Sequence, residues 1–165
     1  EYIKASPPGQ VAQALVPLLE NAGLKAEVSA VSQNWLAQLV VLVKERAKTL
    51  VEMVEWVKPY FGEAVMFEEE AARKFLTPAI APMLGKLLKR FETLPSFSKQ
   101  EWEEAFKALV EEEAIKMGQL AQPVRVALTG RTASPGLFEV MEVLGRDRTL
   151  ARLRAGIERA YSGQA

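Results

Sequence analysis

The sequence contains neither cysteine nor histidine. Without cysteine the chain has no disulfide, no thiolate nucleophile and no cysteine metal site. Without histidine it lacks the most common general acid or base and the most common metal ligand. Ser-His-Asp and Cys-His catalysis and imidazole zinc sites are therefore excluded, although carboxylate or lysine chemistry stays open. We predict no catalytic residue and no metal site in this chain.

Long apolar runs are also missing, since none approaches the length of about 20 residues that spans a bilayer. No basic start followed by an apolar stretch and a small-residue cleavage site indicates secretion. The 165 residues are 49% hydrophobic and 25% charged, as in ordinary globular domains. We expect a cytoplasmic protein without membrane contact. The start at Glu1-Tyr2-Ile3, without methionine, indicates a fragment of a longer protein.

Motifs that would support independent catalysis are lacking as well. The glycines are scattered and form neither of the common phosphate-binding loops. The acids Glu111, Glu112 and Glu113 are consecutive, which is far more typical of a solvated helix face than of a metal or acid–base cluster. Ser134 precedes Pro135, where a helix cap is a better interpretation than a nucleophile. Binding must therefore carry the function.

Apolar residues recur at helical spacing through almost the whole chain, and strand patterns are nearly absent. Glycine, proline and capping residues set the expected helix ends, with Gly23, Gly118, Gly130 and Gly145 as terminators. The sequence therefore predicts an all-α fold. The expected helices cover residues 9–22, 32–50, 50–60, 68–77, 83–91, 98–118, 124–130, 134–145 and 147–161.

A turn-rich break lies at residues 94–98, directly before the strongest local helix signal. That signal is Ser98 followed by Glu101, a capping box in which each side chain satisfies the other residue's backbone amide. We place a division between two small helical subdomains here. The expected subdomains are residues 1–93 and 94–165.

Charge is unevenly distributed although the net charge is zero. Residues 1–113 carry 13 Lys/Arg and 17 Asp/Glu, whereas residues 114–165 carry 8 Lys/Arg and 4 Asp/Glu. Seven of those eight cations are arginine, whose planar donor fork suits phosphates and bases. This asymmetry favours an anionic partner only mildly, and a solvated charged helix face is an equally good interpretation.

The stretch between Gly118 and Pro135, with Arg46 upstream, holds the residue types that bind single-stranded RNA. RNA loops are recognised by splayed bases that stack and hydrogen-bond along their edges. Arg125, Gln122 and the helix start at Ser134 could supply those contacts. A salt bridge for Arg125 and a helix cap for Gln122 remain the alternative interpretation.

Several motifs resemble one family. Residues 118–130 (GQLAQPVRVALTG), residues 134–139 (SPGLFE), Leu144-Gly145 and residues 148–153 (RTLARL) resemble the C-terminal signatures of bacterial glutamyl-tRNA synthetases. Residues 44–50 (KERAKTL) resemble a helix of that family's first anticodon-binding subdomain, and Tyr2-Ile3-Lys4 resembles the segment that precedes it. The resemblance covers essentially the whole chain, and residues 61–91 match less closely.

The resemblance implies a helix cage that holds the anticodon loop of a glutamate tRNA. It places Arg46 where the family senses the third anticodon base, so that arginine there accompanies discrimination against glutamine tRNA. The other anticodon-binding positions implied are Gln122, Arg125, Ser134, Pro135 and Leu137. From the arginine-rich tail we expect phosphate contacts at Arg131, Arg148 and Arg152.

The family uses ATP and magnesium in a catalytic domain to attach glutamate to tRNA. Both ATP-site signatures of that domain are absent here, and the histidine-containing one is impossible. We therefore expect an inactive, monomeric chain without its own cofactor, whose partners are tRNA and the catalytic domain of the parent enzyme. The alternative is a helical protein-interaction module that does not bind tRNA.

Overall fold

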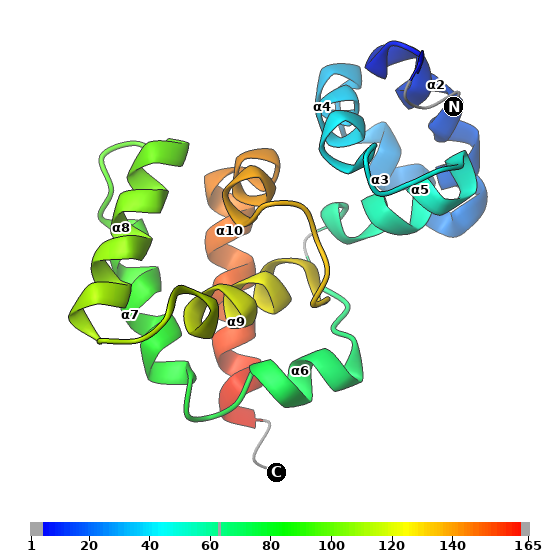
Figure 1. The fold of residues 1–165 in the computed structure, drawn as a ribbon. Helices are drawn as coiled ribbons and strands as arrows, with labels where there is room; N and C mark the ends of the chain where they lie inside the picture. The colour runs from blue at the N-terminus through cyan, green and yellow to red at the C-terminus, as the bar shows by residue number, and fades with distance from the viewer. Residues whose placement is uncertain (1–4, 63, 163–165) are drawn as a thin grey trace. The chain divides into compact units, whose positions relative to one another are not determined.

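The computed structural model describes residues 5–62 and 64–162, and the Tyr2-Ile3-Lys4 match lies outside these ranges. The described part is built of helices joined by short connections, and no strand occurs there, which confirms the all-α prediction (Figure 1). A π-helical segment, Glu20–Leu24, joins α2 directly to α3. No helix in these ranges is long and apolar enough to cross a membrane. The α-helices are α2 (Pro8–Leu19), α3 (Lys25–Ser29), α4 (Gln33–Val43), α5 (Leu50–Val57), α6 (Glu69–Phe75), α7 (Ala81–Glu92), α8 (Lys99–Glu112), α9 (Met117–Thr129) and α10 (Leu137–Ser162).

The chain forms two compact units, Glu1–Gly62 and Glu63–Ala165. The division therefore differs from the one expected at residues 93 and 94. The turn at residues 94–98 joins α7 to α8, which pack on each other and on α10 within the second unit. Phe97 in this turn contacts Trp102, with ring centroids 4.0 Å apart. The break is thus the loop of a helical hairpin, and its apolar side chain anchors it to the unit.

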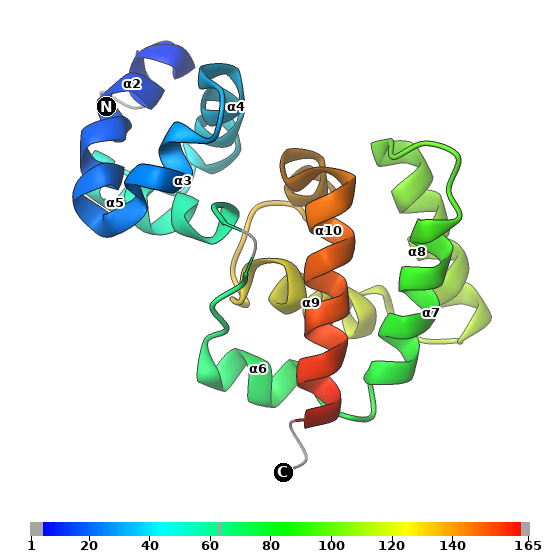
Figure 2. The same ribbon diagram turned by 180° about the vertical axis from the view of Figure 1, so that it is seen from behind.

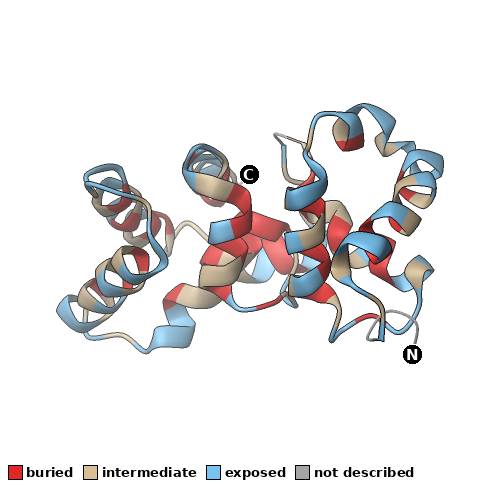
Figure 3. Ribbon diagram, turned by 90° about the horizontal axis from the view of Figure 1, so that it is seen from above, coloured by how far each residue is buried: buried red, intermediate tan, exposed pale blue. Residues whose placement is uncertain are grey.

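The first unit packs α2 against α4 and α5. Its core is mostly aliphatic, with Tyr60 and Phe61 also buried. Figure 3 colours the buried positions red along its helices. Pro8 is the first residue of α2, where its missing amide costs nothing. Gly23 has φ 91° and ends the first helical segment as the sequence predicts.

The helix predicted over residues 32–50 is wrong in its second half. α4 ends at Val43, and Lys44, Glu45 and Arg46 form a turn. Thr49 has extended backbone angles, and its side chain accepts a hydrogen bond of 3.1 Å from the Glu52 amide. This N-cap begins α5, so the chain must leave the helical conformation before it.

In the second unit, α10 packs against α9, α7 and α8, and α6 packs against α9. Figures 1 and 2 show α10 running through the middle of this unit. The contact between α9 and α10 is close because Gly156 has no side chain: a Cβ there would lie 2.5 Å from Cβ of Ala127. Gly156 therefore sets how near α10 comes to the helix that carries Arg125.

The predicted helix over residues 98–118 is two elements. α8 begins at the predicted Ser98 cap but ends at Glu112, and Ala114 has φ 54°. The amides of Ala114 and Ile115 donate to the carbonyls of Glu111 and Val110, the pattern of a Schellman motif. Met117 is 39% exposed and begins α9.

A loop of residues 130–136 joins α9 to α10. α9 begins at Met117 and runs through Gly118 and Pro123, so the helix end predicted at Gly118 and the helix start predicted at residue 124 are wrong. Its other end is as predicted, with Gly130 in the left-handed conformation, φ 78°, after Thr129. α10 begins at Leu137 and not at Ser134, so the expected capping role of Ser134 is wrong. Gly145 interrupts α10 with φ 81° and ψ 170°, which agrees with the predicted break between two helical halves.

Candidate nucleic-acid interface

The structure brings three predicted polar residues together at the α9–α10 loop. Nε of Arg125 donates to Oγ of Ser134 at 2.8 Å, and Nη1 of Arg125 donates to Oε1 of Gln122 at 2.7 Å. Gln122 and Arg125 lie three residues apart on α9, a spacing that makes helix side chains neighbours. Two fixed acceptors therefore hold the guanidinium, whose flexible stem would otherwise carry large rotamer entropy.

Ser134 connects this arrangement to the loop backbone. Its hydroxyl accepts from Arg125 and donates to the Pro135 carbonyl at 2.8 Å. All three polar side chains are half-buried, whereas Pro135 and Leu137 are buried. The two apolar residues thus anchor the loop in the core. A base could contact Leu137 only through the 6% of its surface that is exposed. We call Gln122, Arg125 and Ser134 the Arg125 cluster.

The loop that carries Ser134 is fixed by contacts to the segment before α6. The Glu68 amide donates to the Gly130 carbonyl at 2.9 Å. A Cβ on Gly130 would lie 2.1 Å from the Met66 carbonyl oxygen, and its φ of +78° also disfavours a side chain. Thr129 adds a hydroxyl that donates to the Arg125 carbonyl at 2.8 Å and accepts from the Arg131 amide at 3.2 Å. Neither Glu68 nor Thr129 was predicted as part of this site.

The three arginines expected to contact phosphates differ in position. Nε of Arg131 lies 3.7 Å from Oε1 of Glu68, and its side chain is 28% exposed. Arg148 is half-buried. Arg152 is 1% exposed, and its Nη1 donates to the Leu128 carbonyl at 2.7 Å. Burial removes Arg152 from the surface on which a phosphate would bind, so we correct its expected role to that of a structural residue.

Other cations of the tail are paired with carboxylates. Nη2 of Arg154 lies 2.6 Å from Oε2 of Glu92, and Nη2 of Arg159 lies 3.9 Å from Oε1 of Glu69. The positive tail is therefore partly neutralised by acids on α6 and α7. This pairing gives weight to the interpretation of the tail as a charged helix face.

An ion pair also marks the start of α10. Nζ of Lys99 lies 3.0 Å from Oε1 of Glu139. The hydrogen bond from Lys99 lowers the pKa of the Glu139 carboxyl, and the same bond raises the pKa of the Lys99 ammonium. Glu139 lies in the first turn of α10, where its negative charge also suits the helix dipole.

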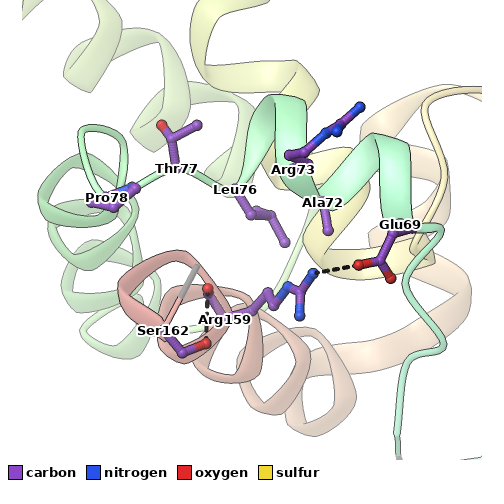
Figure 4. A pocket seen from close by; sticks show the side chains of 8 residues that line it. All are labelled: Glu69, Ala72, Arg73, Leu76, Thr77, Pro78, Arg159 and Ser162. Atoms are coloured by element: carbon purple, nitrogen blue, oxygen red, sulfur yellow. Dashed lines mark hydrogen bonds and ion pairs between the residues drawn. The ribbon is translucent and has the colours of Figure 1, made fainter. Parts of the chain in front are cut away.

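Two pockets lie along α6. One of about 350 Å³ adjoins the Arg125 cluster, since Gln122 and Thr132 line it together with Lys74 and Phe75 of α6. The other, of about 370 Å³, lies where α6 faces the end of α10, and Arg159 reaches across it toward Glu69 (Figure 4). None of the predicted site residues lines this second pocket. Among the described residues no group of three His, Cys, Asp or Glu could hold a metal ion.

Arg46 lies in the first unit, on the turn after α4, and is exposed. Its Cζ lies 5.9 Å from the ring centroid of Trp56 on α5, within the range of a cation–π contact. Arg46 was predicted to lie on a helix, and Trp56 was not predicted to contact it. The Thr49-x-x-Glu52 capping signal, present in the sequence, could have located the turn.

An all-α chain with an arginine held beside a fixed loop fits a known class of domain. Residues 10–157 match the family described as anticodon binding domain. The chain therefore belongs to the anticodon-binding domain family.

The relatives and solved structures it resembles are glutamate–tRNA ligases. The one from Geobacter sulfurreducens is 42% identical over 156 residues, which cover 94% of this chain and 33% of the relative. The one from Desulfosudis oleivorans is 41% identical over 158 residues, 96% of this chain and 33% of the relative. A crystal structure of a glutamate tRNA ligase from Elizabethkingia meningosepticum in complex with its amino acid matches 95% of this chain and 30% of that chain, with a TM-score of 0.77 at 25% identity. The chain thus spans about one third of the length of these relatives.

Proposed function

We propose that this chain binds the anticodon loop of a glutamate tRNA and is the anticodon-binding region of a longer glutamate–tRNA ligase. Its family and the names of its relatives support this role. The observation that carries the proposal is the Arg125 cluster, a guanidinium held by two acceptors beside a rigid loop. In the parent enzyme, the catalytic domain would use ATP to attach glutamate to the tRNA held here.

Arg125 is the central binding residue in this proposal. A guanidinium carries five N–H donors in a planar fork, and a good bidentate pair with a base edge is worth about 1–3 kcal/mol of discrimination. The hydrogen bonds to Gln122 and Ser134 fix the plane of that fork before RNA arrives. Because the fork is already ordered, less entropy is lost when a base binds.

Arg46 is proposed to sense the third anticodon base from the first unit, and Arg131 and Arg148 to contact phosphates. Phosphate contacts add affinity that does not depend on sequence and falls as salt rises. Because Arg154 and Arg159 are paired with carboxylates, we expect the contribution of phosphate contacts to the affinity to be modest. Base contacts at Arg125 and Arg46 therefore carry most of the proposed selectivity.

Fluorescence anisotropy with a labelled glutamate-tRNA anticodon stem-loop tests the role of Arg125. Arg125→Ala should weaken binding by roughly 5- to 150-fold, the equivalent of about 1–3 kcal/mol. Arg73→Ala is the matched control, because Arg73 is an exposed arginine of the same unit, 73% exposed, that pairs with Glu70 outside the cluster. Equal effects of the two substitutions would contradict the role of Arg125. Absence of binding by the wild-type chain would favour the protein-interaction alternative.

A further inference from the structure

Arg46 lies on the turn that follows α4. α4 ends at Val43, and the Arg46 amide donates to the Val43 carbonyl at 2.9 Å. Its side chain extends from the surface of the first unit. Selective recognition of one base requires that the guanidinium be held in a restricted orientation, because ordering a long side chain costs rotamer entropy.

Trp56 is positioned to be that group. Its ring centroid lies 5.9 Å from Cζ of Arg46, and the indole is half-buried on α5. On either side along the helix, Met53 and Val57 are both 0% exposed. α5 is therefore anchored in the core, and the indole presents a fixed aromatic surface to the Arg46 side chain.

The turn that carries Arg46 is tied to the helix that carries Trp56. Oγ1 of Thr49 accepts from the Glu52 amide at 3.1 Å, and Oε2 of Glu52 accepts from the Lys48 amide at 2.9 Å. These reciprocal bonds hold the chain directly after Arg46 against the first turn of α5. The distance between the guanidinium and the indole is thus set by capping as well as by their mutual attraction.

We propose that Trp56 is a positioning residue that holds the Arg46 guanidinium for recognition of the third anticodon base, an inference that rests on the proposed function. A guanidinium stacks on aromatic rings and on nucleobases alike. With the indole on one side, Arg46 meets the incoming base in a restricted orientation. Trp56 acts through Arg46 and does not itself contact the base.

The test compares stem-loops that differ only in the third anticodon base, with the ratio of their Kd values as the readout. Trp56→Leu should reduce that ratio by about two- to five-fold, the size expected for loss of one exposed cation–π contact. Trp56→Phe, which keeps an aromatic ring, should retain most of the ratio. Val51→Ala is the control, because Val51 is 69% exposed on the same helix and has no role here.

The double variant Arg46→Gln/Trp56→Leu separates positioning from folding effects. If Trp56 acts through Arg46, Trp56→Leu has no further effect on the ratio once Arg46 is gone. A ratio unchanged by Trp56→Leu, or lowered equally with and without Arg46, would overturn the inference while leaving the role of Arg46 intact. If Arg46→Gln alone leaves the ratio unchanged, the proposed role of Arg46 fails, and the role of Trp56 fails with it. Thermal unfolding of each variant verifies that the first unit stays folded.

Discussion

Arg152 illustrates how little an arginine's sequence position says about its environment. It lies in the same arginine-rich segment as Arg148 and Arg154, yet it is 1% exposed and donates to the Leu128 carbonyl. That carbonyl belongs to the last turn of α9, where no helical amide is available to pair with it. Composition predicts that Arg152 lies on the surface. It is buried because α10 packs on α9.

Arg152→Met should therefore lower the free energy of unfolding. Loss of the donor leaves the buried Leu128 carbonyl without this partner, at a cost of about 1–3 kcal/mol. Urea denaturation followed by circular dichroism measures the change. Arg154→Met is the control, since that exposed ion pair is worth at most about 1 kcal/mol. If Arg152→Met were no more destabilising than Arg154→Met, the structural role given to Arg152 would be wrong.

The Arg125 cluster was partly predictable at this scale. Helical spacing puts Gln122 beside Arg125, and the family resemblance selects both residues together with Ser134. The hydrogen bond from Arg125 to Ser134 joins residues nine positions apart across a loop, which no periodicity specifies. Ser134 was also predicted to cap a helix, because Ser-Pro precedes many helices. In the structure its hydroxyl instead hydrogen-bonds to Arg125 and to the Pro135 carbonyl.

Among the elements, the helix ends predicted at Gly23, Gly130 and Gly145 and the helix start at Ser98 are right, whereas the end predicted at Gly118 is wrong because Gly118 lies inside α9. Gly23, Gly130 and Gly145 all have positive φ and all interrupt or end helices. The end of α8 was missed because Ala114 holds the left-handed position, and alanine gives no such signal. The start of α9 was missed too. It begins after Lys116, whose amide donates to Oε1 of Gln119 at 2.7 Å, whereas Gly118 in the sequence indicated a helix end at this point.

Ala114→Gly should stabilise the protein. A left-handed conformation costs an L-residue roughly 1–2 kcal/mol, and glycine avoids that cost while giving up about 0.4–1 kcal/mol of unfolded-state entropy. A net gain of about 0.5–1 kcal/mol is expected, because Ala114 is exposed and loses no packing. Chemical denaturation gives the value. Ala108→Gly, inside α8, should instead lower the free energy of unfolding. If Ala114→Gly lowered it as well, the Schellman motif assigned to the end of α8 would be wrong.

At the scale of the whole chain, the all-α class and most helices follow from periodicity, whereas the division into units does not. The turn at residues 94–98 carries strong turn residues, but Phe97 packs on Trp102 and closes a hairpin. The division follows Gly62, which has φ 79° and no comparable cluster of turn residues beside it. A unit boundary reflects which helices bury each other's apolar faces, and that information is distributed over distant residues.

We propose that the two units of this chain recognise an anticodon loop by its bases. The most direct measurement compares binding of the chain to a glutamate-tRNA anticodon stem-loop and to the same stem whose three anticodon bases are replaced, at one fixed salt concentration. Both RNAs carry the same stem and phosphates, so any difference in Kd comes from the anticodon bases. The account predicts at least about tenfold tighter binding to the native loop, equivalent to one good base contact. Equal Kd values for the two RNAs would contradict it.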